Sequence, residues 1–266
     1  MAQLLRGTAF ITGAASGIGQ HTALSFARHG IRRLALADIN AAGLEAANAA
    51  LSARFPHVEI LSLRLDVRDP RGVRDCVRRT ADRFGRLDVA VNNAGIGGSG
   101  RPTHAVPESE WRGVLDVDLD GVWRCQREEL AVMVEQEDLG VREGRGRIIN
   151  VASMLGLIAP GVRQLPHTAY SAAKHGVIGM TRGDANHYGP KNIRINAICP
   201  GYVETPLLNK VLEDPSSPLR SDFDNTPLQR LAQMDEIGDA ITFLASPMSS
   251  FVQGAALVAD GGFSTQ

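Results

Sequence analysis

Tyr170 and Lys174 are the residues of this chain whose types and spacing most directly suggest chemistry. They are four positions apart, so on a helix both side chains lie on one face. A phenol, with a pKa of about 10, is a poor base at neutral pH, but a neighbouring cation favours the phenolate and lowers that pKa. Such a pair can move a proton to or from a hydroxyl or carbonyl oxygen, although the same spacing also arises by chance in many helices.

A glycine-rich turn near the N-terminus suggests that phosphate groups are bound as well. The apolar run Thr8–Thr12 leads into Gly13, Gly17 and Gly19, and a helical pattern follows. Glycines let backbone N–H groups approach a pyrophosphate, which the helix dipole also attracts. Asp38 ends the next apolar run, 19 residues after Gly19, where an acidic side chain can accept hydrogen bonds from an adenosine ribose. The alternatives are a turn without a ligand and an aspartate that caps the next helix.

Short β-branched runs alternate with helical patterns along the whole chain. The expected strands are Thr8–Thr12, Leu34–Asp38, Val58–Leu65, Leu87–Val91, Arg147–Ala152, Ile193–Ile198 and Ala255–Ala259. Helices are expected after the glycine turn and over Ala41–Arg54, Arg71–Phe84, Glu108–Glu137, Ala169–Tyr188 and Asp235–Ala245. The pattern predicts an α/β fold, a Rossmann-type doubly wound parallel sheet of about seven strands with helices on both faces. Because no flexible linker interrupts residues 1–266, we expect a single domain.

The order of these motifs resembles the short-chain dehydrogenase/reductase family. Thr12-Gly13-x-x-x-Gly17-Ile18-Gly19, Asn92-Asn93-Ala94-Gly95, Ser153, Tyr170-x-x-x-Lys174 and Pro200-Gly201 occur in the family's order, up to the closing Asp260-Gly261-Gly262. The resemblance implies hydride transfer between a nicotinamide cofactor and a secondary alcohol or ketone. In that reaction Tyr170 is the general acid or base, Lys174 supports it, and Ser153 orients the substrate oxygen.

The resemblance also assigns the cofactor site. The implied contacts are Gly13, Ser16, Gly17, Ile18, Gly19, Asp38, Asp66, Val67, Asn93, Ala94, Gly95, Tyr170, Lys174, Pro200, Gly201, Val203 and Thr205. Asp38 would repel the 2′-phosphate of NADP, the next residue is the uncharged Ile39, and Ser16 stands where many NADP-preferring relatives carry a basic residue. We therefore expect NAD as the cofactor, with NADP disfavoured.

The chain departs from the family pattern at Asp118, where relatives usually have asparagine. The family asparagine acts largely through its main-chain carbonyl, which holds a water joined to the lysine. We expect Asp118 to keep this role while its side chain bonds to neighbouring backbone; the alternative is a carboxylate that interacts with Lys174. The interval between Ser153 and Tyr170 is also a few residues longer than usual, and Val162–Pro166 resembles a small insertion.

Further features concern the substrate and the assembly. Residues 205–230 contain four prolines and form the long excursion typical of a lid. Its apolar residues favour a hydrophobic or alicyclic substrate: Leu207, Leu208, Val211, Leu212, Leu219 and Phe223. Relatives pair the helices that correspond to Glu108–Glu137 and Ala169–Tyr188, and often their C-terminal segments, here Phe251–Phe263, which implies a homo-oligomer and favours a tetramer.

Composition excludes several classes of protein. The 28 basic and 29 acidic residues give a net charge of −1, which argues against a nucleic-acid partner. No apolar run approaches the ~18 residues that a membrane span needs, and no secretion signal is recognisable. Three scattered cysteines fit a reducing compartment, so we expect the cytoplasm.

Other candidate sites and two other functions remain open. No metal site is expected, since the acidic residues of the lid (Glu213, Asp214, Asp222 and Asp224) lack ligand spacing. His167, His175 and Cys199 are interpreted as packing or solvated residues. The alternatives to a redox enzyme are a member of the same fold that uses the pocket for non-redox chemistry, and a non-catalytic dinucleotide-binding protein.

Overall fold

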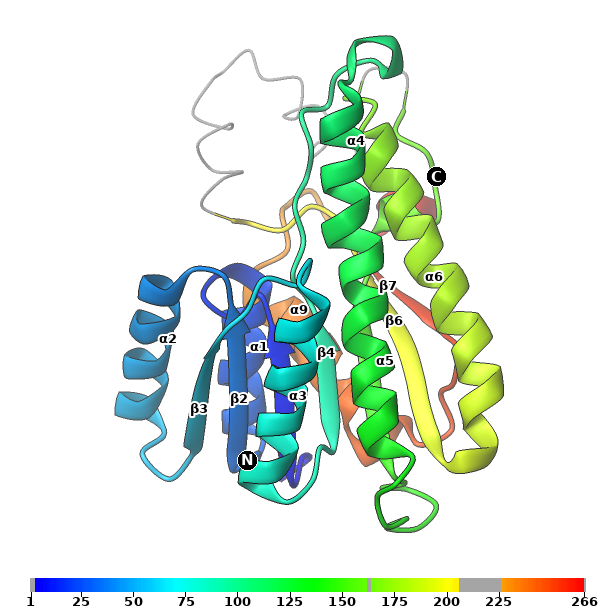
Figure 1. Ribbon diagram of the computed structural model, residues 1–266. Helices are drawn as coiled ribbons and strands as arrows, with labels where there is room; N and C mark the ends of the chain where they lie inside the picture. The colour runs from blue at the N-terminus through cyan, green and yellow to red at the C-terminus, as the bar shows by residue number, and fades with distance from the viewer. Residues whose placement is uncertain (1–2, 162–163, 206–225, 266) are drawn as a thin grey trace.

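Seven parallel strands form one twisted sheet in the computed structural model, which describes residues 3–161, 164–205 and 226–265 (Figure 1). Their spatial order is β3-β2-β1-β4-β5-β6-β7, so the chain reverses its direction of travel across the sheet between β1 and β4. Ligands bind at such a switch point, outside the carboxyl ends of the strands. The strands are β1 Thr8–Thr12, β2 Arg33–Asp38, β3 Glu59–Arg64, β4 Val89–Asn92, β5 Gly146–Val151, β6 Ile193–Pro200 and β7 Ala256–Ala259.

Helices cover both faces of the sheet, as the alternation of elements predicts (Figure 1). One core cluster joins α1, α2 and α9 to strand residues such as Ile11 and Leu36. A second joins α3 and α5 to the alternate residues Phe10 and Ala35, because successive strand side chains point to opposite faces. The main helices are α1 Gly17–Arg28, α2 Ala41–Arg54, α3 Pro70–Phe84, α4 Glu108–Leu115, α5 Val122–Met133, α6 Thr168–Tyr188 and α9 Met234–Ala245.

The expected helix Glu108–Glu137 is not continuous. Its central turn, Asp116–Gly121, is a π-helix between α4 and α5, and α5 ends at Met133. The extra residue of a π-turn changes which side chains face the neighbouring elements, and such turns are frequent at functional sites. Here the wide turn carries Asp118, which is buried.

The remaining expected elements agree with the structure to within one or two residues. Local chemistry explains some of the ends: Asp69 accepts a hydrogen bond from the N–H of Arg71, Pro70 occupies the first turn of α3, and the left-handed Gly85 follows its last residue. Most of the expected lid, residues 206–225, lies outside the described residues. Among the described residues, no helix has both the length and the apolar character needed to cross a lipid bilayer.

Candidate active site

The glycine turn connects β1 to α1 at the switch point of the sheet. Gly13 and Gly17 both have positive φ angles, 65° and 58°, which glycine adopts without steric cost. A Cβ on Gly13 would lie 2.7 Å from the side-chain nitrogen of Asn93, so a larger residue would displace the neighbouring strand end. The Ser16 side chain makes no capping bond to α1, which leaves the first N–H groups of this helix available to an anion.

Asp38 faces this turn from the end of β2. Its Oδ2 accepts a hydrogen bond from the N–H of Ala15 (2.9 Å) and its Oδ1 from the N–H of Asn40 (2.8 Å). The N-cap of α2 is Asn40, whose side chain accepts from Gly43, so the alternative interpretation of Asp38 as a helix cap is wrong. Asp38 is oriented by two backbone groups, and each of its oxygens retains a lone pair for a further donor.

Thr12 and Asn93 tie the ends of β1 and β4 together. The Thr12 hydroxyl accepts hydrogen bonds from the N–H groups of Asn93 (3.0 Å) and Ala94 (3.1 Å). The Asn93 side chain donates to the carbonyls of Thr12 (3.0 Å) and Gly13 (3.1 Å). These bonds fix the shape of the glycine turn and of the Asn-Ala-Gly segment relative to each other.

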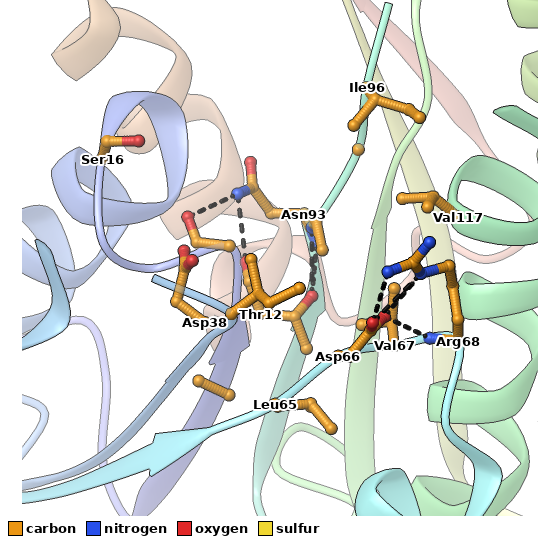
Figure 2. Close-up of a pocket in the computed structure, with 15 residues that line it drawn as sticks. Thr12, Ser16, Asp38, Leu65, Asp66, Val67, Arg68, Asn93, Ile96 and Val117 are labelled. Carbon is orange, nitrogen blue, oxygen red and sulfur yellow. Dashed lines mark hydrogen bonds and ion pairs between the residues drawn. The ribbon is translucent and has the colours of Figure 1, made fainter. Parts of the chain in front are cut away.

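A cavity of about 450 Å³ lies between these strand ends (Figure 2). Most of the cofactor residues expected on the adenosine side line it: Gly13, Ser16, Asp38, Asp66, Val67, Asn93, Ala94 and Gly95. Gly17, Ile18 and Gly19 are not in its wall, and neither are the catalytic candidates or the residues after β6. The cavity therefore matches the expected adenosine and phosphate end of a dinucleotide site.

Arg68 belongs to the same wall, although the motifs did not identify it. Its guanidinium group binds the carboxylate of Asp66 through Nε (2.9 and 3.1 Å) and Nη2 (2.6 Å), as Figure 2 shows. This hydrogen-bonded cation lowers the pKa of Asp66, which therefore stays ionised. The sequence offers only a weak signal for this contact: Arg68 follows Asp66 by two residues and carries the opposite charge.

The catalytic candidates lie beyond the cavity, at the carboxyl end of β5. Lys174 is buried on α6, where its Nζ donates to the carbonyl of Val151 (3.0 Å) and lies 5.3 Å from the centre of the Tyr170 ring. Ser153 follows β5, and its hydroxyl accepts from the N–H of Leu155 (3.2 Å). Gly156 lets this turn pack on α6, because a Cβ there would lie 2.8 Å from the carbonyl oxygen of Lys174. The fold thus brings β5 and α6 together around these side chains.

Asp118 corrects the expectation of a purely structural side chain. Its Oδ1 accepts the N–H of Ile96 (2.8 Å), as expected of a residue that bonds to backbone, but its Oδ2 lies 3.3 Å from Nζ of Lys174. The side chain is fully buried. Burial raises the pKa of Asp118, while the Lys174 ammonium and the Ile96 N–H oppose that rise. The carboxylate is therefore both a backbone anchor and the ionic partner of Lys174.

The residues after β6 are held against the C-terminal strand. The N–H of Gly201 donates to the carbonyl of Ala259 (3.0 Å), and a Cβ at this glycine would lie 2.7 Å from the backbone of Asp260. Val203 forms a parallel bridge with Ala232. Thr205 is the last described residue before position 226. This segment starts at the same edge of the sheet as Ser153. Its expected contacts with the cofactor require that position.

The minor candidates differ in how they are placed. Burial raises the pKa of the Cys199 thiol to about 11, which keeps it protonated and unreactive. His175 is exposed and bonds through Nδ1 to the carbonyl of Ser171 (2.9 Å). His167 has a left-handed backbone conformation (φ 43°) and lies edge-on to the Tyr170 ring, with the ring centres 6.5 Å apart. The acidic residues between Glu213 and Asp224 lie outside the described residues.

Comparison with known proteins gives consistent matches over nearly the whole chain. A family model described as enoyl-(acyl carrier protein) reductase matches residues 13–264. Levodione reductase of Leifsonia aquatica is 37% identical over 257 residues, which cover 95% of this chain and 92% of that protein. Cis-4-hydroxycyclohexanecarboxylate dehydrogenase of Sinomonas cyclohexanicum is 38% identical over 255 residues, which cover 96% and 95%.

Solved structures agree with these sequence matches. The crystal structure of levodione reductase superimposes with a TM-score of 0.88 at 36% identity, covering 97% of this chain and 98% of that one. NAD⁺-bound xylitol dehydrogenase gives a TM-score of 0.86 at 30% identity, covering 96% and 98%. The chain therefore belongs to the short-chain dehydrogenase/reductase family, and is an oxidoreductase that transfers a hydride between a nicotinamide cofactor and a secondary alcohol or its ketone.

Proposed function

We propose that this protein is an NAD-dependent dehydrogenase or reductase whose substrate is a hydrophobic, preferably alicyclic, secondary alcohol or ketone. The observation that carries the proposal is the contact between the Lys174 ammonium and the Tyr170 ring, 5.3 Å away, beside Ser153 at the carboxyl end of β5. Related proteins act on ring compounds by name, as levodione reductase, cyclohexanol dehydrogenase and a hydroxycyclohexanecarboxylate dehydrogenase. The half-exposed Ile96 side chain adds an apolar surface to the wall of the cavity.

In this reaction each side chain of the site has a separate role. Ser153 offers a hydroxyl that orients the substrate oxygen, and Tyr170 takes the proton of an alcohol or returns it to a ketone oxygen. Lys174 keeps a positive charge beside the phenol and retains an N–H donor for sugar hydroxyls. The glycine turn, Asp38 and the Asn-Ala-Gly segment fit a dinucleotide, because they line one cavity at the carboxyl ends of the strands. When bound, the nicotinamide ring supplies the hydride donor or acceptor.

Asp38 supports NAD over NADP. Its carboxylate is directed to the turn by Ala15 and Asn40, and a 2′-phosphate beside it would bring two negative charges together. Arg68, the basic side chain in the cavity wall, is already bound by Asp66 through two nitrogens. Its charge is therefore not free to compensate for a phosphate.

We further propose that residues 1–266 act as one catalytic domain in a cytoplasmic homotetramer. A groove between α5 and α6 is lined by Trp123, whose side chain is half-exposed, together with Leu130 and Val134. Phe251 is fully exposed near β7. An isologous contact at each of these two surfaces would give D2 symmetry. The three cysteines are unpaired, as in proteins of reducing compartments.

The direct test is Tyr170→Phe with a panel of cyclic alcohols and ketones, followed at 340 nm. Loss of the phenol oxygen should lower turnover by ~10²–10⁴-fold, the range for removal of a general acid or base. Binding of NADH, measured by its fluorescence, should be retained because the ring still packs. Turnover of the variant at the wild-type rate would refute the role of Tyr170 as the general acid or base. Wild-type protein that binds NADH but oxidises or reduces no member of the panel would favour non-redox chemistry or a dinucleotide-binding role.

A further inference from the structure

The carboxylate of Asp118 connects two parts of the site that are distant in sequence. One oxygen accepts the backbone N–H of Ile96 (2.8 Å), at the wall of the cavity, and the other lies 3.3 Å from the ammonium nitrogen of Lys174. Gly95 makes room for this arrangement, because a Cβ there would lie 3.1 Å from Oδ2 of Asp118 and 3.6 Å from Nζ of Lys174. Three elements therefore converge on one buried ion pair.

Because Asp118 and Lys174 are buried, the charge of each side chain depends on the other. Both side chains are almost completely removed from solvent, with exposed fractions of 0% and 4%. A lone buried ammonium loses its proton readily, since the interior disfavours the charged form. The carbonyl of Val151 offers Lys174 a hydrogen bond but no charge. The carboxylate of Asp118 is the one negative charge that contacts the ammonium among the described residues.

We propose that Asp118 is a positioning residue with two effects. It keeps Lys174 charged, and it holds the ammonium group in a fixed position relative to Ile96, in the segment that lines the cofactor cavity. The Val151 carbonyl and the Asp118 carboxylate account for two of the three N–H donors of the ammonium group, which leaves one for the phenol or for the hydroxyls of a bound nucleoside. An asparagine at position 118 would keep the bond to Ile96 and lose the charge. The proposal rests on the proposed function only for the identity of the reaction that Lys174 supports.

The other ionisable groups around the pair do not supply this charge. Tyr170 lies one turn earlier on α6, with its ring centre 5.3 Å from the ammonium nitrogen, and a phenol that still holds its proton has no charge. Cys199 on β6 is buried, with a thiol pKa raised to about 11, so it is also neutral. Asp116 and Asp120, on the same π-turn, face Arg124 instead, at 2.7 and 3.9 Å. Asp120 is more than half-exposed and provides a matched control for removal of one carboxylate.

The chain is well suited to a direct measurement, because it contains only three lysines, Lys174, Lys191 and Lys210. Protein labelled with ¹³C-lysine gives three Cε signals, which Lys→Arg variants at 191 and 210 assign. The Lys174 signal is followed through a pH titration in the wild type and in each variant. In Asp118→Asn its midpoint should fall by about one pH unit or more, the effect of losing an opposite charge at this range. Asp120→Asn should leave it unchanged.

Kinetics provide a second readout. The basic limb of the kcat/KM profile should move to lower pH in Asp118→Asn by the same amount as the Lys174 midpoint, and Asp118→Ala should in addition weaken NADH binding, because the Ile96 N–H loses its acceptor. An unchanged Lys174 midpoint in Asp118→Asn would overturn the proposal. If that variant does not fold, a wild-type Lys174 that titrates well below Lys191 would overturn it as well. The NMR titration needs no turnover, so its result is independent of the Tyr170→Phe test.

Discussion

Glu129 should make the stability of this protein fall as the pH rises. The side chain is fully buried on α5, where its Oε2 accepts one hydrogen bond from the Asn92 amide (3.0 Å) and its Oε1 has no partner in the described structure. Burial raises the pKa of Glu129 from 4.5 to about 8, against the small opposing effect of the Asn92 bond. At neutral pH the folded protein therefore holds this acid in its protonated form.

The sign and size of the effect follow from proton linkage. Above pH 4.5 the unfolded chain releases the proton of Glu129, whereas the folded chain keeps it until the pH reaches about 8. Stability decreases with pH wherever the folded state binds more protons, by about 1.4 kcal/mol per pH unit for one group. Between pH 5.5 and pH 7.5 this residue should therefore cost about 3 kcal/mol. The stability that Glu129 contributes by holding its proton is fully present below pH 4.5, and it is lost as the pH rises to about 8.

Glu129→Gln removes the proton and keeps the shape. Urea unfolding of both proteins at pH 5.5, 6.5, 7.5 and 8.5, at one protein concentration, gives the difference in the free energy of unfolding. Between pH 5.5 and pH 7.5 the free energy of unfolding of the variant should rise by about 3 kcal/mol relative to that of the wild type. The difference between the two proteins should level off near pH 8. Glu128→Gln is the control, because the neighbouring side chain has a cationic partner, Arg127, and is partly exposed to solvent. Parallel stability curves for wild type and Glu129→Gln would refute the reasoning.

Two further predictions concern the cofactor and the assembly. The wild type should prefer NAD over NADP by roughly 30–150-fold in kcat/KM, equivalent to ~2–3 kcal/mol, and Asp38→Ser should narrow that ratio; equal values for the two cofactors in the wild type would contradict the assignment. Light scattering at micromolar concentration should give the mass of a tetramer, and Trp123→Glu, which places a charge in the groove between α5 and α6, should reduce it. A monomeric wild type would count against the assembly.

The sheet and the glycine turn could be predicted because their signals are local. Strand β1 and helix α2 have the bounds that the sequence indicates, since apolar runs and turn residues mark their ends. Asp38 was identified from its distance to Gly19 and from its position at a strand end, and it does face the glycine turn. The parallel order then places the carboxyl ends of all strands at one edge, so the candidate residues meet there.

Other features depend on contacts that no local pattern encodes. The π-turn at Asp116–Gly121 has the same apolar spacing as an ordinary helix. Gly121 permits its close approach to the segment after β3, because a Cβ would lie 2.7 Å from the side chain of Val67. Glu128 and Glu129 are adjacent and chemically alike, yet Glu128 reaches solvent and pairs with Arg127 whereas Glu129 is fully buried. Which of the two enters the core is decided by how α5 rotates after the π-turn, which is a tertiary effect.

The two buried acids of this helical segment show why burial alone does not determine charge. Asp118 has an ammonium partner 3.3 Å away and a backbone donor, and these oppose the rise in its pKa. Glu129, eleven residues later, has a single amide donor, so burial raises its pKa to about 8. A rise in pH toward 8 therefore weakens the fold through Glu129. Because the two acids contact different elements, Glu129→Gln should remove the cost in stability and leave the charge at Lys174 intact.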